Sequence, residues 1–145
     1  MFKYTDERNA QIVVALLKAK GIRYIVASPG TTNGPILGSV QNDSFFKVIS
    51  CVDERSAAYM ACGIAESTGE AVVLSCTGAT ASRNYMPGLT EAYYRKLPIL
   101  AITSMGRTQE VGNLRTQILD RSVLPNDIAN ESVNIEPVET DAEAR

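Results

Sequence analysis

The sequence of 145 residues contains no histidine and no tryptophan, and it has only three cysteines. Without histidine, a Ser-His-Asp triad, a Cys-His pair and every histidine-based metal site are excluded. The cysteines are odd in number and lack the spacing of a metal site, so we expect buried free thiols at Cys51, Cys62 and Cys76. Acid–base chemistry would therefore have to come from carboxylates or from a bound cofactor.

Long apolar runs are also missing, because none approaches the roughly 18 residues that a membrane span needs. The first ten residues, MFKYTDERNA, are polar and show no signal pattern. The net charge is −2, which gives no indication of a nucleic-acid or membrane partner. With 45% hydrophobic and 21% charged residues, the composition is typical of a globular protein, and the length suits one α/β domain. We expect a cytoplasmic protein.

Short apolar segments alternate with segments of helical periodicity along most of the chain. The predicted strands span residues 22–27, 46–52, 71–76 and 98–103. The first predicted helix begins after a cap at Thr5. Three more helices are predicted over residues 35–41, 56–68 and 81–95, and the last of them is split at Pro87 and Gly88. This alternation predicts an α/β fold with three layers, in which a parallel sheet has helices on both faces in a flavodoxin-like arrangement.

The last part of the chain has a different composition. From Asn126 onward, acidic residues outnumber basic ones and apolar residues are sparse. We therefore predict one domain over residues 1–125 and an acidic linker or frayed tail over residues 126–145.

Four loops follow the predicted strands, and in a parallel sheet they gather on one edge, where ligands bind. They comprise residues 28–32, 53–54, 77–80 and 104–106, and they are rich in Gly, Ser and Thr. None matches G-x-G-x-x-G or a Walker sequence, so Thr77, Gly78 and Thr80 could simply form a tight turn. Glu54 could likewise be no more than a favourable acid at a helix N-terminus. Spacing alone leaves both questions open.

The order of these motifs resembles a known family. An S-P-G loop is followed by a Glu heading an Ala-rich helix, then by a strand ending in T-G-A-T, then by E-A-Y before a proline and a strand. The stretches SPGTTNGPIL and DERSAAYMACGIAESTGEAVVLSCTGATASRNYMPGLTEAYYRKLPILAITS carry the similarity over roughly residues 9–124. They resemble the pyrimidine-binding domain of thiamine-diphosphate-dependent enzymes, in the group of acetolactate synthases, 2-oxoacid decarboxylases and the menaquinone-pathway synthase.

The resemblance implies a catalytic role for Glu54. In this family the corresponding Glu hydrogen-bonds N1′ of the aminopyrimidine and favours its imino tautomer, which then deprotonates the thiazolium ring. The cofactor supplies the base, so the absence of histidine poses no difficulty. The resemblance further implies cofactor-binding residues at Thr77, Gly78 and Asn84, with Asn84 near the cofactor or a dimer contact. It implies substrate-side residues at Ser28, Pro29, Gly30, Thr31 and Gln117, with Arg115 a possible carboxylate clamp.

Two departures limit what the resemblance implies. The chain contains no G-D-G motif, which in the family holds the diphosphate through Mg²⁺. We therefore expect no metal site here and expect a diphosphate-binding domain or partner subunit, the chain being a fragment or a small subunit. Thr31-Thr32 stand where the menaquinone-pathway enzyme has an arginine, so isochorismate is not assigned as the substrate.

The predicted function is a domain or subunit of a homo-oligomeric enzyme, either a 2-oxoacid decarboxylase or an acetolactate-synthase-like transferase. It would use thiamine diphosphate to decarboxylate or carboligate a 2-oxoacid, and this chain alone should be inactive. Two alternatives remain at this point. One is a non-catalytic assembly module of the same fold, and the other is an unrelated flavodoxin-like nucleotide-binding domain.

Overall fold

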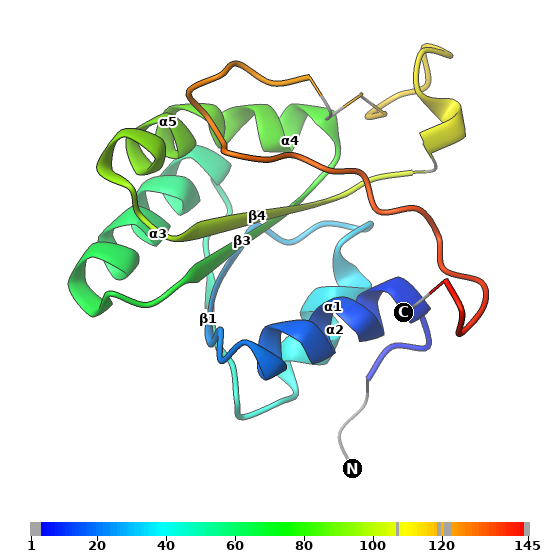
Figure 1. The fold of residues 1–145 in the computed structure, drawn as a ribbon, viewed down its shortest axis with the longest axis horizontal. Helices are drawn as coiled ribbons and strands as arrows, with labels where there is room; N and C mark the ends of the chain where they lie inside the picture. Colours follow the sequence, from blue (N-terminus) through cyan, green and yellow to red (C-terminus); the bar gives the residue numbers. More distant parts are fainter. Residues whose placement is uncertain (1–3, 107, 119, 121–122, 144–145) are drawn as a thin grey trace.

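A four-stranded parallel sheet in the order β2-β1-β3-β4 forms the centre of the molecule (Figure 1). The computed structural model describes residues 4–106, 108–118, 120 and 123–143. The strands are β1 (Tyr24–Ala27), β2 (Lys47–Ser50), β3 (Val72–Thr77) and β4 (Ile99–Ser104). Because β1 pairs with both β2 and β3, the two central strands are β1 and β3.

Helices cover both faces of the sheet. One face carries α1 (Arg8–Ala19) and α2 (Gly34–Gln41). The opposite face carries α3 (Glu54–Thr68), α4 (Ala79–Asn84) and α5 (Met86–Arg95), and a short 3-10 helix, η1 (Thr108–Glu110), follows β4. This arrangement confirms the predicted three-layer α/β fold. In the described part of the chain, no helix has the length and apolar character needed to cross a bilayer.

The two hydrophobic cores follow from the alternation of side chains along the central strands. Ile25 packs in the core beneath α1 and α2, whereas its neighbour Val26 packs in the core beneath α3, α4 and α5, and neither side chain is exposed. The same alternation separates Val73 from Val72 and Leu74 in β3. Strands that are buried on both faces read as continuous apolar runs, which is why the sequence predicted a covered parallel sheet.

Helices α3 and α5 approach each other closely at one glycine. A Cβ atom at Gly88 would overlap the side chain of Ala58 and would lie 3.0 Å from its backbone carbon. The Cys62 thiol also donates to the Gly88 carbonyl, at 3.3 Å. Small residues on both helices are therefore required for this contact, which places the first turns of α3 beside α4 and α5.

Two helix boundaries differ from the sequence prediction. Thr5 does not cap α1, because its hydroxyl accepts from the Glu7 backbone N–H in a turn and its own N–H donates to Ser39 on α2. The break between α4 and α5 falls at Tyr85 rather than at Pro87 and Gly88. Proline is tolerated in the first turn of a helix, so Pro87, the second residue of α5, does not interrupt it.

The acidic C-terminal residues lie against α1 in this structure. The Asn9 amide donates to the Glu136 carbonyl at 2.9 Å and accepts from the Val138 N–H at 2.8 Å. Arg8 donates to the Glu139 carbonyl and pairs with Asp141. This segment is thus tied to the first helix, while the division of the chain at residue 125 stays a prediction.

A cluster of hydrogen bonds around Asp43 fixes Tyr4 to the turn after α2. The buried carboxylate of Asp43 accepts from Lys18 on α1 at 2.6 Å, from the Tyr4 hydroxyl, and from the Phe45 N–H at 2.9 Å. The hydrogen bonds from Lys18 and Tyr4, in that order of importance, lower the pKa of Asp43 to about 2.

This lowered pKa predicts a loss of stability in acid. The contribution of Asp43 is present above the ordinary carboxyl pKa of 3.8 and disappears as the pH falls toward about 2, because protonation removes the charge that the cluster stabilises. Urea unfolding at pH 7, 4 and 2.5 should show Asp43→Asn less stable than the wild type at pH 7, with the difference shrinking across that interval. Asp6→Asn, at an exposed acid outside the cluster, is the control. A difference for Asp43→Asn that stays constant with pH would contradict the assignment.

Candidate functional site

The candidate site lies at the carboxyl ends of β1 and β3, where the chain leaves the sheet in opposite directions. The loop after β1 leads to α2 on one face, whereas the loop after β3 leads to α4 on the other. In open α/β sheets, ligands bind at the point where the connections of two adjacent parallel strands diverge in this way. Glu54 enters the same edge from β2, at the beginning of α3.

Asn33 organises the loop after β1. Its side chain is fully buried, and its amide oxygen accepts from the Gly30 N–H at 2.8 Å. Its amide nitrogen donates to the Ser28 carbonyl at 3.1 Å and to the Ser75 hydroxyl on β3 at 3.2 Å. One buried amide therefore folds the S-P-G-T-T-N loop onto itself and fastens it to the neighbouring strand.

The Ser104 carbonyl at the end of β4 joins two of the loops. It accepts from the Gly78 N–H at 3.0 Å and from the Thr32 hydroxyl at 2.8 Å. The loops after β1 and β3 are thus held to a common acceptor, which confirms the expectation that the strand-end loops gather on one edge.

Glycine is required where these loops approach each other. A Cβ atom at Gly30 would overlap the Thr77 side chain. At Gly78, where φ is +31°, a Cβ atom would lie 2.6 Å from the Gln117 side-chain oxygen. That oxygen also accepts from the Thr80 N–H at 3.1 Å and from the Thr80 hydroxyl at 3.0 Å, so Gln117 covers the first turn of α4.

Glu54 is the first residue of α3 but does not cap it. The cap is Asp53, whose carboxylate accepts from the Ser56 N–H at 2.7 Å. Among the described residues, Glu54 makes no hydrogen bond or ion pair, although it is half-buried. The preceding Cys51 is fixed to the loop after β1, because its carbonyl accepts from the Ser28 hydroxyl at 2.8 Å. The Glu54 carboxylate is therefore without a partner among the described residues at this edge of the sheet.

Tyr85 lies beneath the head of α3, between α4 and α5. It is fully buried in the core that contains Ala57, Ala58 and Cys76, and its hydroxyl has no hydrogen-bond partner among the described residues. Burial is the main cause that raises the pKa of this hydroxyl, and the nearby Cys76 and the Glu54 carboxylate raise it further. The Glu54 charge thus acts on a hydroxyl inside the core.

The structure brings most of the predicted site residues together. The contacting loops contain Ser28, Gly30, Thr77, Gly78 and Gln117. Glu54 lies three residues after Cys51, whose carbonyl accepts from the Ser28 hydroxyl. Pro29 and Thr31 are exposed in the same loop.

Two further predicted residues have partners of their own. Asn84 is exposed at the last turn of α4, and its amide donates to the Thr80 carbonyl at 3.2 Å. Arg115 forms an ion pair with Glu110 at 3.5 Å. The roles proposed for these residues stay predictions.

The sequence does not indicate the structural roles of three residues at this edge: Asn33, Tyr85 and Ser104. A buried Asn in a Gly- and Thr-rich loop looks like any turn residue, because Asn commonly occurs in turns. Ser104 takes part only through its backbone carbonyl, which no side-chain motif can indicate. Tyr85 stands two positions before Pro87, but nothing in that pattern predicts its burial.

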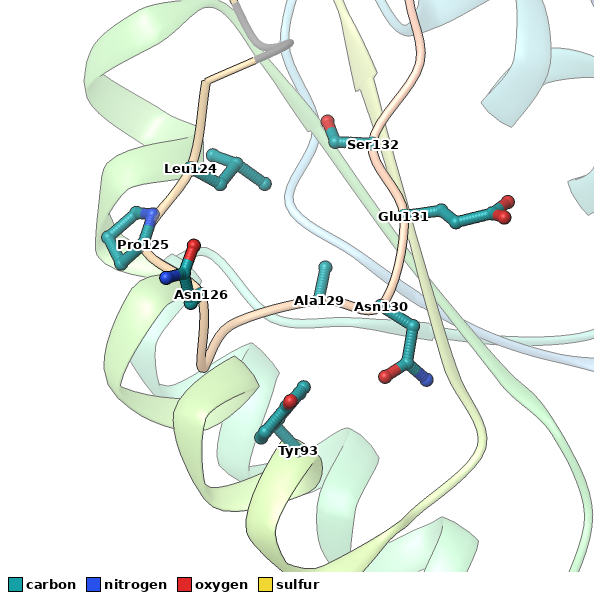
Figure 2. A pocket seen from close by; sticks show the side chains of 8 residues that line it. All are labelled: Tyr93, Leu124, Pro125, Asn126, Ala129, Asn130, Glu131 and Ser132. Carbon is teal, nitrogen blue, oxygen red and sulfur yellow. The ribbon is translucent and has the colours of Figure 1, made fainter.

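A separate hollow of about 300 Å³ lies between α5 and the segment 124–132, with Tyr93, Asn126, Asn130 and Glu131 on its walls (Figure 2). It includes none of the residues at the strand ends. No group of three or more potential metal-ligating Cys, Asp or Glu side chains occurs in the described ranges of the chain.

Comparison with known proteins gives a consistent result. Residues 8–130 match the family described as thiamine pyrophosphate enzyme, N-terminal TPP binding domain. Two curated relatives are both named 2-succinyl-5-enolpyruvyl-6-hydroxy-3-cyclohexene-1-carboxylate synthase. The one from Porphyromonas gingivalis is 43% identical over 101 residues, covering 70% of this chain and 18% of the relative. The one from Bacteroides thetaiotaomicron is 33% identical over 138 residues, covering 95% and 25%.

Solved structures show the same fold at low sequence identity. The thiamine diphosphate-dependent 4-hydroxybenzoylformate decarboxylase of Rhodococcus jostii RHA1 aligns with a TM-score of 0.66 at 20% identity, covering 94% of this chain and 22% of its own. Benzoylformate decarboxylase from Polynucleobacter necessarius aligns with a TM-score of 0.66 at 22% identity, covering 74% and 20%. This chain spans a quarter or less of the length of the two curated relatives.

The buried amide of Asn33 generates a prediction about stability. Asn33→Ala leaves the Gly30 N–H, the Ser28 carbonyl and the Ser75 hydroxyl without that partner, and it should lower the free energy of unfolding by about 3 kcal/mol. Urea denaturation measures the change. The control is Asn42→Ala, at an exposed Asn whose amide bonds only the Gly38 carbonyl in the preceding turn, and it should cost less than about 1 kcal/mol. Equal losses in the two variants would show that Asn33 does not organise the loop.

Proposed function

The chain belongs to the thiamine pyrophosphate enzyme family as its N-terminal TPP-binding domain, and we propose that Glu54 is the residue that activates the aminopyrimidine of the cofactor. The enzyme that contains this domain would decarboxylate or carboligate a 2-oxoacid. One observation carries the proposal: Glu54 offers a half-buried carboxylate without a partner among the described residues, at the same edge of the sheet where the loops after β1 and β3 diverge. The family match argues against the alternative of an unrelated nucleotide-binding domain.

A carboxylate without a partner among the described residues can receive a hydrogen bond from a ring nitrogen, and Glu54 offers one at this edge. Gly30 and Gly78 let the Thr77 and Gln117 side chains pack directly against the backbones of the two loops, which holds the loops close together. Thr77 and Gly78 would contact the pyrimidine ring, and the loop of residues 28–31 with Gln117 would form the substrate side. The bound cofactor supplies the electron sink that decarboxylation of a 2-oxoacid requires.

Glu54 would share a proton with a ring nitrogen of the pyrimidine. Partial burial at the head of α3 favours such a shared proton, because a carboxylate that is removed from water gains more from a hydrogen-bond donor. Asp53 performs the capping, so the Glu54 carboxylate can turn toward a ligand without loss of the α3 cap. Ser28, through its bond to the Cys51 carbonyl, holds the loop after β1 at a fixed position relative to the head of α3.

The diphosphate end and Mg²⁺ would be held by another domain, located either elsewhere in a longer chain or in a partner subunit. Support comes from the length of the relatives, of which this chain covers 18% to 25%. The loop after β1 carries no basic side chain, and the Thr32 hydroxyl there is already bonded to Ser104. We therefore propose the 2-oxoacid class alone and assign no acceptor.

This division of the cofactor site predicts weak binding by the chain of 145 residues. Isothermal titration with thiamine diphosphate and Mg²⁺ should give a dissociation constant above about 1 mM, because contacts to the pyrimidine alone supply little free energy. Adding the diphosphate-binding part of the enzyme should restore tight binding. Micromolar binding by this chain alone would contradict the proposal.

The role of Glu54 predicts a large loss of activity in Glu54→Gln, measured in the complete enzyme. Turnover of 2-oxoacids should fall by about a hundredfold or more, because the amide cannot share the proton. The control is Asp53→Asn, which removes the neighbouring charge and retains a good helix cap, and its turnover should stay within about threefold of the wild type. Retained turnover in Glu54→Gln would remove Glu54 from the mechanism.

A further inference from the structure

The Tyr85 hydroxyl is the polar group that the proposed mechanism leaves unexplained. It is fully buried, and none of the described residues forms a hydrogen bond of normal geometry with it, although the Ser28 hydroxyl and the Cys76 thiol lie near it. A buried hydroxyl without a partner is unfavourable by comparison with phenylalanine, which has the same shape without the polar atom. A purely structural requirement for an aromatic ring at this position therefore does not account for the hydroxyl.

Tyr85 lies in the same core as the first turns of α3, the helix that begins with Glu54. Tyr85 joins α4 to α5 and packs with Ala57 and Ala58, which lie in the first two turns of α3 directly after Glu54. Cys51, at the end of the strand that leads to Glu54, also packs against this core. Tyr85 therefore lies in the core beneath the helix that begins with Glu54.

Cys76, Ser28 and Glu54 are the side chains that act on this hydroxyl, and they differ as acceptors. The Cys76 sulfur is only a weak acceptor. The Ser28 hydroxyl directs its proton to the Cys51 carbonyl and is a neutral acceptor held in place by the loop. The Glu54 carboxylate is charged, half-buried and free of hydrogen bonds and ion pairs among the described residues. A charged acceptor forms a hydrogen bond about twice as strong as a neutral one, so Glu54 is the favoured partner.

Building on the proposed function, we propose that Tyr85 is a positioning residue for Glu54. Its buried hydroxyl donates a hydrogen bond to one carboxylate oxygen when Glu54 turns into the cleft, so that the other oxygen faces the aminopyrimidine nitrogen. The unfavourable burial of the hydroxyl is then offset only when Glu54 is engaged. Tyr85 thereby ties the productive orientation of the carboxylate to cofactor binding.

A double-mutant cycle in the complete enzyme tests this inference. Tyr85→Phe, Glu54→Gln and the double variant are compared for thiamine diphosphate affinity, measured by calorimetry with Mg²⁺, and for turnover. In the wild-type background, Tyr85→Phe should weaken cofactor binding several-fold and lower turnover about tenfold, as expected for loss of a hydrogen bond to a charged group. In the Glu54→Gln background, the same change should alter both quantities less than twofold.

Two further measurements separate positioning from structural support. The thermal midpoint of the cofactor-free enzyme should be unchanged or raised by Tyr85→Phe, because the hydroxyl has no partner there. Tyr59→Phe removes a hydroxyl from a half-exposed tyrosine on α3 and should change neither binding nor turnover. The inference is overturned if Tyr85→Phe behaves as the wild type, if its effect is equal in both backgrounds, or if it lowers the midpoint by several degrees.

The cycle also distinguishes this inference from the proposed function. If Glu54→Gln alone leaves affinity and turnover unchanged, the proposed function fails. If Glu54→Gln abolishes turnover while Tyr85→Phe is neutral, the proposed function stands and only the role of Tyr85 is wrong.

Discussion

The buried amide of Asn33 is the interaction on which the functional edge depends. The chain leaves β1 and β3 toward opposite faces, and backbone groups at such a divergence would lose their sheet partners if nothing replaced them. Asn33 provides replacements for the Gly30 N–H and the Ser28 carbonyl and adds a bond to Ser75. Because this side chain is fully buried, its geometry is set by packing and not by solvent.

Neighbouring carboxylates divide two tasks at the head of α3. Asp53 satisfies the helix N-terminus, and its hydrogen bonds from Ser56 lower the pKa of its carboxyl. Glu54 has no structural task among the described contacts and lies over a core that contains the unpartnered Tyr85 hydroxyl. Polar groups that lack partners in the folded chain can form hydrogen bonds with a ligand, and those bonds would contribute to the free energy of binding.

Most of the fold could be predicted from local patterns. The apolar runs at residues 22–27 and 71–76 became the central strands β1 and β3, because only strands covered on both faces are apolar throughout. The boundaries were less predictable. Thr5 has the chemistry of a helix cap, yet its N–H donates to Ser39, which is distant in sequence. Pro87 lies in the first turn of a helix that its presence was expected to interrupt.

The sequence by itself determined the fold class, the order of the strand-end loops and the resemblance that marked Glu54, because periodicity and motif order are local properties of the chain. Only the tertiary structure decided that Gln117 covers Gly78 and that Tyr85 lies buried beneath α3. These facts depend on contacts between residues that are far apart along the chain. Such contacts exist only after the sheet has brought its carboxyl ends together, and no local pattern encodes them.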